Sequence, residues 1–482
     1  MNPTRREILI GATSVATLAA IPHARAQPTK RLTASTRNIQ VNGKAARVFS
    51  LVGPDGQPGI TLAPGERFAV TLENQAGAQT IVHWHGQLPD WKQDGFPWPQ
   101  TPSIPAGGHK DYDFAPIAGT YWMHSHHELQ EQVLMAAPLI VHNRASAAAD
   151  AQEVVMPLHD FSFKSPDELL AGLTHAGATM AGMDNKRMGN MPMGNTATGT
   201  NTAMNMGGMT SVADLNDVDY DAFLANERTL ADPQLVRAPA GQDIRLRIIN
   251  GASSTNFWID LGQLSGKVIA VDGHDLMPVA GTRFPIAMAQ RLDILLRLPR
   301  AGAYPILAQV EGKTDRTGII LATPGAKVGA VSPQAATAAP ALDLAWESQL
   351  AAANPLAPRP ADITLPLTLD GNMAKYVWSL NGKTWPNPHV LMVQHGQRVM
   401  IDMVNHSMMS HPMHLHGHAF QVVAINNRKI GGAMRDTVLV PPMGRVLVAF
   451  DADNPGRWAL HCHNLYHMAA GMLTELRYPG IV

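Results

Sequence analysis

The single cysteine of this 482-residue chain lies between two histidines, in the run His461-Cys462-His463, and His467 and Met472 follow shortly after it. A lone thiol has no partner for an internal disulfide. Thiolate, imidazole and a weakly bound thioether together form the donor set of a blue-copper electron-transfer site. The pattern therefore predicts a metal site in which Cys462 is the thiolate ligand.

Histidine pairs separated by one residue are the second chemical signal, because five of them occur in the chain. They are His83/His85, His124/His126, His414/His416, His416/His418 and His461/His463. Residues i and i+2 of a strand face the same side, about 6.6 Å apart along the chain, so such a pair can bind two metal ions a few ångströms apart. The residue between them faces the opposite side. Cys462 can therefore bind copper on one face while His461 and His463 bind copper on the other, with a short covalent route for electrons.

A threefold repeat indicates the elements that must position these side chains. Segments that begin with Gly, end with Asn and alternate apolar residues between them occur at 65–74, 241–250 and 396–405. Such alternation predicts half-buried strands. A second segment recurs at 119–126, 302–309 and 456–463, with Leu307 and Gln309 in the middle copy where the others carry histidine. The repeat predicts three copies of one all-β sandwich, with metal chemistry between domains one and three and domain two as a spacer.

The composition supports this fold class and sets the domain boundaries. With 41 Gly, 36 Pro and 16% charged residues, the chain is typical of a turn-rich β protein. We predict domains at 27–150, 151–325 and 361–482, with an Ala- and Pro-rich linker at 326–360. A short helix is expected near 165–174, where Ser165-Pro166-Asp167-Glu168 has a cap, an early proline and early acids.

The N-terminus has the order of an export signal. Arg5-Arg6 precedes an apolar stretch from Ile8 to Ile21, and Ala24-Arg25-Ala26 follows. The alternative is a membrane anchor, but the apolar run is shorter than the ~20 residues needed to span a bilayer. We therefore predict a twin-arginine signal peptide at 1–26 and a periplasmic mature protein without a membrane span. The net charge of −1 gives no electrostatic reason to expect binding to nucleic acid.

A methionine-rich insert interrupts the second domain at 180–209, among Gly, Asn and Thr residues without periodicity. Thioethers are soft donors that suit Cu(I), so we expect this insert to bind Cu(I); the alternative is a disordered low-complexity insertion. The eight candidate ligands are Met180, Met183, Met188, Met191, Met193, Met204, Met206 and Met209.

Four motifs of the chain resemble, in order, the copper motifs of the multicopper oxidases. They are His83-Trp-His85-Gly86, Tyr121-Trp-Met-His124-Ser-His126, His411-Pro-Met-His414-Leu-His416-Gly417 and His461-Cys462-His463-(x)3-His467-(x)4-Met472. The signal, the methionine-rich insert and the C-terminal motif are most similar to the periplasmic copper-resistance branch, the CopA or PcoA type. The resemblance implies three cupredoxin-like Greek-key domains, four copper ions and reduction of O2 to water.

The resemblance also implies a role for each ligand. The type 1 copper is expected at His411, Cys462, His467 and the axial Met472, and the type 2 copper at His83 and His414. One type 3 copper is expected at His85, His124 and His463, and the other at His126, His416 and His461. Asp94 corresponds to a family acid beside the type 2 copper, with an expected role in orienting a ligand and donating protons; the alternative is a plain Asp-Gly turn.

Two acids of the family pattern are missing from this chain. Many members carry an acid directly after the second type 1 histidine, where this chain has Met468, and cuprous oxidases of the laccase-like branch carry one at the position of Ser407. The proton route and any substrate-copper site therefore cannot be carried over from those relatives.

The sequence leaves three functions to distinguish. The first is a multicopper oxidase, expected to be a monomer, that oxidises Cu(I) and protects the periplasm from copper. The second is a laccase that oxidises phenols or aromatic amines. The third is a copper-sequestering protein, which the complete set of eight cluster histidines argues against because storage needs no site for O2.

Overall fold

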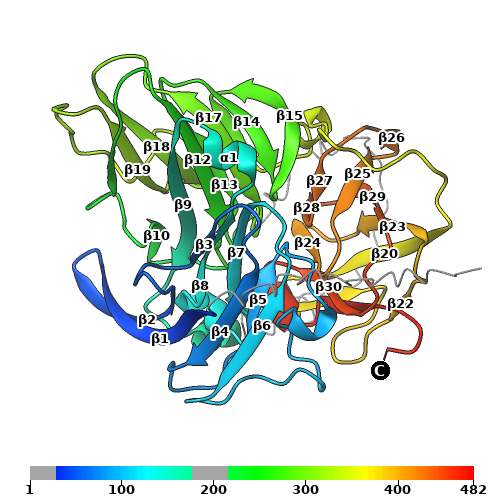
Figure 1. Ribbon diagram of the computed structural model, residues 1–482. Helices are drawn as coiled ribbons and strands as arrows, with labels where there is room; N and C mark the ends of the chain where they lie inside the picture. The colour runs from blue at the N-terminus through cyan, green and yellow to red at the C-terminus, as the bar shows by residue number, and fades with distance from the viewer. Residues whose placement is uncertain (1–28, 176–214, 482) are drawn as a thin grey trace, which may run out of the picture.

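The computed structural model describes residues 29–175 and 215–481, so the predicted signal peptide and the methionine-rich insert lie outside the described residues. Six sheets account for the described strands, two in each third of the chain (Figure 1). Within the described part of the chain, no helix has the length and apolar character that a bilayer-spanning helix needs. The prediction of an all-β protein is confirmed.

The first third forms two four-stranded sheets, in the orders β2-β1-β4-β6 and β3-β8-β7-β5. The apolar alternation read in residues 65–74 is the strand β4, whose side chains are alternately buried and half-buried. The elements are β1 (Lys30–Val41), β2 (Lys44–Val52), β3 (Ile60–Leu62), β4 (Phe68–Asn74), β5 (Val82–His85), η1 (Trp91–Gln93), β6 (His109–Phe114), β7 (Gly119–Ser125), η2 (Gln130–Val133), β8 (Ala136–Val141) and α1 (Arg144–Ala148).

The middle third is built in the same way, with sheets β10-β9-β12-β17-β14-β15 and β11-β19-β18-β13-β16 around its own apolar core. Residues 166–175 are helical. Ser165 Oγ accepts a hydrogen bond from the backbone of Glu168, whose carboxylate accepts one from the backbone of Ser165, which confirms the predicted helix and its cap. The strands are β9 (Ala151–Phe161), β10 (Ala222–Ala225), β11 (Leu235–Arg237), β12 (Asp243–Asn250), β13 (Phe257–Asp260), β14 (Gly266–Val271), β15 (His274–Gly281), β16 (Arg283–Ile286), β17 (Arg291–Arg297), β18 (Ala303–Val310) and β19 (Arg316–Ala322).

The last third has the sheets β21-β20-β23-β29-β25-β26, with β27 paired to β25, and β22-β31-β30-β24-β28. The chain reaches it from β19 through a segment that contains isolated bridges and η3 (Glu347–Gln349). The elements are β20 (Ile363–Asn372), β21 (Val377–Leu380), β22 (Leu391–Met392), β23 (Arg398–Asn405), β24 (His411–Leu415), β25 (Phe420–Ile425), β26 (Arg428–Lys429), β27 (Met434–Arg435), β28 (Thr437–Val440), β29 (Arg445–Asp451), β30 (Arg457–Cys462), α3 (Leu465–Ala469) and β31 (Leu473–Arg477).

The asparagine that ends each repeat has the same structural role three times. Asn74, Asn250 and Asn405 are all fully buried. Each side-chain oxygen accepts a hydrogen bond from the backbone N–H two residues later. Each side-chain amide donates to backbone carbonyls of neighbouring loops, such as Met409 and Val440 for Asn405. Asparagine thus ends the strand and ties the following loop to it.

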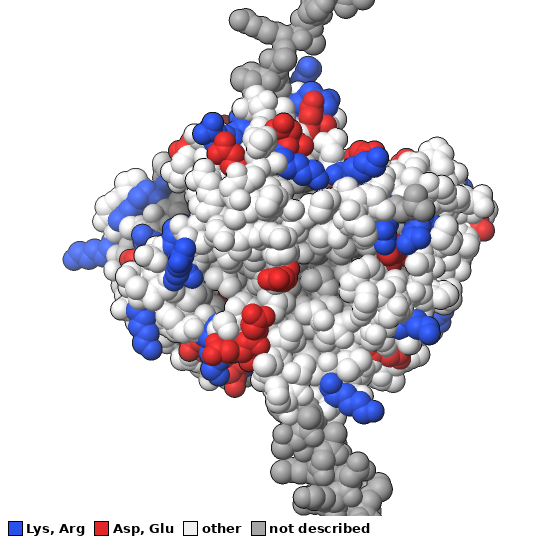
Figure 2. Space-filling view, turned by 90° about the horizontal axis from the view of Figure 1, so that it is seen from below, with Lys and Arg blue, Asp and Glu red and all other residues white. Residues whose placement is uncertain are grey.

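Charged side chains are sparse on the face shown in Figure 2. Among the described residues there, Lys, Arg, Asp and Glu occur in small groups separated by uncharged surface.

Candidate metal centres

The first cluster of metal-binding side chains lies in the core of the last third. His411 at the start of β24, Cys462 at the end of β30 and His467 in α3 are all fully buried. Cys462 Sγ lies 3.6 Å from His411 Nδ1 and 3.7 Å from His467 Nδ1, and the two Nδ1 atoms are 3.1 Å apart. One thiol and two imidazoles therefore converge, as predicted from the Cys462 motif.

Local backbone structure explains the spacing of this motif. Asn464 caps α3, because its side-chain oxygen accepts from the backbone N–H groups of Tyr466 and His467. One turn of helix then places His467 back beside Cys462. Hydrogen bonds from Met472 N to His467 O and from Cys462 N to Met472 O bring the fully buried Met472 into the same core.

Burial sets the protonation of these groups. It raises the pKa of Cys462, and a nearby Asp217 adds to the effect, so the free thiol is protonated at neutral pH. Burial also lowers the pKa of His411 well below its usual value, with His467 contributing. The site thus offers a neutral imidazole, and a metal ion that binds there must displace the proton of Cys462.

The second cluster contains eight histidines where the first and last thirds meet, and every one is buried. Strand pairing creates it: β5 pairs with β7 so that His83 lies opposite His124, and β24 pairs with β30 so that His414 lies opposite His461. In Figure 1, β5 and β7 from the blue and cyan part of the chain lie beside β24 and β30 from the orange and red part.

Ring nitrogens from both thirds converge in this cluster. The closest pairs are His83 Nε2–His414 Nε2 (3.4 Å), His85 Nδ1–His124 Nε2 (3.4 Å), His124 Nε2–His463 Nε2 (3.4 Å) and His416 Nε2–His461 Nε2 (3.1 Å). His126, His416 and His461 also offer nitrogens that lie within 4.8 Å of one another, and His126 Nε2 has no hydrogen-bond partner. The contacts bring together the side chains expected for the type 2 pair and the two type 3 triplets, and His83 also groups with His85 and His124.

Burial favours the neutral form of seven of these eight histidines. Burial, together with repulsion between neighbouring rings, lowers the pKa of most of these histidines well below the usual value, and that of His461 to about 3. Neutral rings keep a lone pair free for a metal ion. Neutral imidazoles in one buried site and a thiol with imidazoles in another are donor sets that fit copper.

The alternation of strand β30 separates the two clusters. Cys462 lies opposite Met413, on the face toward the apolar core, whereas the adjacent His461 lies opposite His414. The two clusters are therefore joined by the backbone of neighbouring residues, as the sequence predicted.

Asp94 lies against two rings of the cluster and is 1% exposed. Its Oδ2 is 2.8 Å from His416 Nδ1, and its backbone oxygen is 2.8 Å from His83 Nδ1. Both nitrogens face away from the converging ring atoms, so Asp94 is placed to fix the orientation of both imidazoles.

Further buried acids touch the clusters and were not found from the sequence, among them Glu131 and Asp217. Glu131 in η2 has Oε2 at 2.7 Å from His124 Nδ1, and burial raises its pKa well above the usual value. Asp217 Oδ2 lies 3.1 Å from His467 Nε2, and both side chains are fully inaccessible to solvent. Glu131 follows His126 by five residues, a weak hint, whereas nothing local marks Asp217, which the fold brings from the middle third.

Ser407 stands where related cuprous oxidases carry an acid, and its hydroxyl lies 2.7 Å from His411 Nε2. His418, the histidine left without a metal role, is also buried, and its Nε2 lies 2.8 Å from the hydroxyl of Tyr478. His418 is therefore a buried side chain that pairs with Tyr478.

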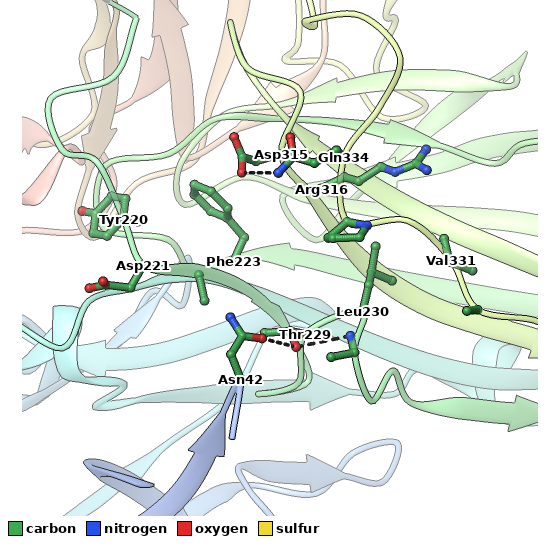
Figure 3. Close-up of a pocket in the computed structure, with 14 residues that line it drawn as sticks. Asn42, Tyr220, Asp221, Phe223, Thr229, Leu230, Asp315, Arg316, Val331 and Gln334 are labelled. Carbon is green, nitrogen blue, oxygen red and sulfur yellow. Dashed lines mark hydrogen bonds between the residues drawn. The ribbon is translucent and has the colours of Figure 1, made fainter. Parts of the chain in front are cut away.

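A cavity of about 410 Å³ lies elsewhere in the middle third, between β10 and the segment around Gln334 (Figure 3). Its lining includes Asn42, Tyr220 and Phe223, and Asn42 Oδ1 accepts a hydrogen bond from Thr229. None of the residues that line it is among the predicted site residues.

Comparison with known proteins places the chain in a family. Family models described as multicopper oxidase match residues 33–146, 175–325 and 358–479. The chain is 33% identical over 471 residues to the multicopper oxidase MmcO of Mycobacterium tuberculosis, covering 95% of this chain and 89% of that protein. It is 25% identical over 564 residues to copper resistance protein A of Escherichia coli, covering 92% of each.

The fold agrees with these matches. The crystal structure of Fet3p, described as a multicopper oxidase that functions in iron import, is similar with a TM-score of 0.73 at 19% identity, covering 93% of this chain and 90% of that one. The six sheets correspond to three cupredoxin domains. The chain belongs to the multicopper oxidase family and is an oxidoreductase that reduces O2.

Proposed function

We propose that this enzyme oxidises Cu(I) at a type 1 copper held by His411, Cys462, His467 and Met472, and passes the electrons to a trinuclear cluster held by the eight buried histidines. The observation that carries this assignment is the position of Cys462 in one cluster and of His461 and His463, its direct neighbours, in the other. Bound copper supplies one-electron transfer and the reduction of O2 by four electrons and four protons to two waters.

The contacts of the acids assign roles to the surrounding side chains. Asp94 holds the rings of His83 and His416 from behind, and Glu131 does the same for His124. The Asp94 carboxylate contacts His416, its backbone oxygen contacts His83, and the Glu131 carboxyl lies 2.7 Å from His124 Nδ1. A hydrogen on each of these Nδ1 atoms leaves the opposite ring nitrogen free to bind copper.

The surroundings of His467 favour a small cationic donor over a planar phenol. The ring that accepts electrons in the proposed type 1 site is completely buried, and Asp217 covers its Nε2 atom. Asn464 donates to the same carboxylate oxygen at 2.6 Å and holds it in place. His467 has no solvent-exposed face on which a phenol from solution could stack, and the Asp217 carboxylate beside it favours a cationic donor over a neutral one.

The methionine-rich insert supports the same choice of substrate. Its eight candidate ligands precede Asp217 in the chain by 8 residues or more, counted from Met209. We propose that this insert collects Cu(I) in the periplasm, after export by the twin-arginine signal, and that the enzyme contributes to copper tolerance. Relatives named copper resistance protein A agree with this role.

Steady-state oxygen uptake with Cu(I) and with a phenol, compared in the wild type and a variant lacking 180–209, tests the proposal. We expect the deletion to abolish Cu(I) oxidation and to leave phenol oxidation unchanged or increased. A second variant with the eight methionines changed to leucine keeps the length of the insert and should behave like the deletion. Unchanged Cu(I) turnover in both variants would show that the insert does not serve the donor, and a wild type that uses phenol alone would make it a laccase.

A further inference from the structure

A buried ion pair joins the middle domain to the histidine cluster. Arg291, at the start of β17, is fully buried, and Asp436, beside β28 in the last domain, is 2% exposed. Arg291 Nη1 donates to Asp436 Oδ1 at 2.8 Å, and its Nη2 donates to Oδ2, so the pair is bidentate. The middle domain therefore contacts the last domain through a buried ion pair as well as through apolar packing.

Asp436 contacts the back of two cluster histidines through two different oxygens. Its carboxylate Oδ1 lies 3.1 Å from His85 Nε2, and its backbone oxygen lies 2.9 Å from His414 Nδ1. If both nitrogens carry the hydrogen, the free lone pairs are His85 Nδ1 and His414 Nε2. These are the same atoms that converge with His124 Nε2 and His83 Nε2 in the cluster.

One residue can thus select opposite tautomers in two neighbouring rings. The tautomer of a metal-binding histidine is set by the hydrogen bond at its other nitrogen. Thr437 reinforces the selection, since its Oγ1 donates to Asp436 Oδ1 at 2.9 Å and lies 3.2 Å from the same two ring nitrogens.

The surrounding structure leaves little room for another arrangement. Arg291 also donates to the carbonyl of Ala289 at 2.9 Å and to that of Thr120 at 3.3 Å, which fixes the plane of its guanidinium. Gly86, the residue after His85, has φ +83°, and a Cβ there would lie 2.5 Å from Asp436 Oδ2 and 2.7 Å from Arg291 Nη2. The glycine of the His-Trp-His-Gly motif therefore allows the ion pair to approach the ligand strand.

We propose that Arg291 is a positioning residue of the trinuclear site, and that it acts through Asp436 to hold His85 and His414 in the tautomers that bind copper. The middle domain then contributes to the metal site. The sequence predicted it to be a spacer, because it lacks the histidines of the other two domains. This inference rests on the copper ligands proposed above. Without the guanidinium, the buried carboxylate loses two of its donors and is free to turn away from His85.

The test compares Arg291→Met with Arg247→Met, a matched control in the same domain. Arg247 is also buried, at 1% exposure, and donates to Thr120 of the first domain and to Asp293, but it contacts none of the cluster histidines. Both variants lose a buried guanidinium that forms an ion pair and contacts another domain, Arg291 through Asp436 and Arg247 through Thr120. Copper per chain after equilibration with a chelator, and the electron paramagnetic resonance spectrum of the type 2 copper, are measured beside the unfolding midpoint.

We expect Arg291→Met to retain copper in the trinuclear site about 10- to 100-fold more weakly and to show an altered type 2 spectrum, while Arg247→Met loses stability only. Arg291→Lys, which keeps the charge, should restore part of the copper retention. If Arg291→Met does not fold, Arg291→Lys and Asp436→Asn are compared with Arg247→Met in its place. Wild-type retention and spectrum in the Arg291 variants, or equal losses in Arg247→Met, would overturn the inference. A wild type that binds no trinuclear copper would instead overturn the proposed function.

Discussion

The outer domains and the middle domain have the same fold but use it differently. Strands β7 and β30 lead into histidine pairs, whereas the corresponding strand β18 carries Leu307 and Gln309. Gln309 donates from its side chain to the backbone carbonyls of Lys313 and Thr337, in two different loops, and Leu307 is 9% exposed. The fold therefore does not require metal, and ligands on two of the three copies make the site.

The middle domain instead contributes charge at the edges of both clusters. Arg291 contacts Asp436 behind the histidine cluster, and Asp217 contacts His467 in the cluster that also contains His411 and Cys462. A domain without ligands can therefore still determine how ligands are held. Four measurements test this division of roles.

The largest effect is expected from Cys462→Ser in the last domain. Because Cys462 is the only thiolate ligand of the proposed type 1 site, its loss should remove the intense visible absorption and reduce oxygen uptake to background. The trinuclear copper should stay bound, since its eight ligands are unchanged. The exposed His395→Gln serves as a control with normal colour and activity. Full colour in Cys462→Ser would place the type 1 copper elsewhere.

Asp94→Asn in the first domain should slow O2 reduction about 10- to 100-fold while the type 1 copper is still reduced at the normal rate. The substitution keeps the backbone oxygen that contacts His83, but it replaces the carboxylate that accepts from His416 with an amide, which is a weaker acceptor. Stopped-flow reduction of the visible band, followed by reoxidation with O2, separates the two steps. Asp90→Asn, a change in the exposed cap of η1, is the matched control. Equal reoxidation in both variants would refute the role of Asp94.

Asp217→Asn tests whether the middle domain contributes to the donor site. Loss of the negative charge beside His467 should lower kcat/KM for Cu(I) about tenfold, which corresponds to about 1.4 kcal/mol. The value for a neutral phenol should change much less, and the visible band should remain. Asp219→Asn, which removes an exposed partner of Lys313, controls for the surrounding segment. Equal losses for both donors would mean that Asp217 only supports the structure.

The smallest effect on catalysis is expected from Glu311→Gln in the middle domain, where stability should change with pH. Burial raises the pKa of Glu311 to about 7, although Leu342 N and Asn256 Nδ2 donate to its carboxylate. Between the unfolded pKa of about 4.5 and 7, the folded state binds more protons, so stability present at low pH is lost as the pH rises.

This loss amounts to at most about 3 kcal/mol, and Glu311→Gln should remove it from the pH profile. Urea unfolding of the apoprotein at pH 5 and pH 8 measures the difference, with the exposed Glu128→Gln as control. Identical pH profiles for wild type and Glu311→Gln would show that this acid does not titrate in the range given.

The histidine pairs and the cysteine motif were predictable because strand alternation converts sequence spacing into direction. Once His461, Cys462 and His463 are assigned to a strand, the two faces follow, and the register of β24 and β30 agrees. The threefold repeat gave the three domains for the same reason. Asn405 and its two equivalents explain why each repeat ends in asparagine. The side chain accepts from the backbone just after the strand and donates to the loop that follows.

The acids around the clusters could not be predicted in this way. Asp217 and Asp436 reach their histidines across domain boundaries, and an isolated acid in a loop has no periodicity that marks its burial. Arg291 begins a strand with the sequence pattern of an ordinary buried strand. Its contact with Asp436, 145 residues later, depends on how the domains pack and has no signal in the local sequence. Only Asp94, close in sequence to His83, was identified before the structure.

Cys462 is the only thiol of the chain, and it is fully buried. No disulfide can form within the polypeptide, so its stability does not depend on the redox state of the compartment in which it folds. The chain can fold in a reducing compartment and keep its structure in an oxidising one. Its one thiol is buried and is therefore shielded from forming disulfides with other molecules. Maturation of this enzyme therefore needs metal supply and no oxidative folding machinery.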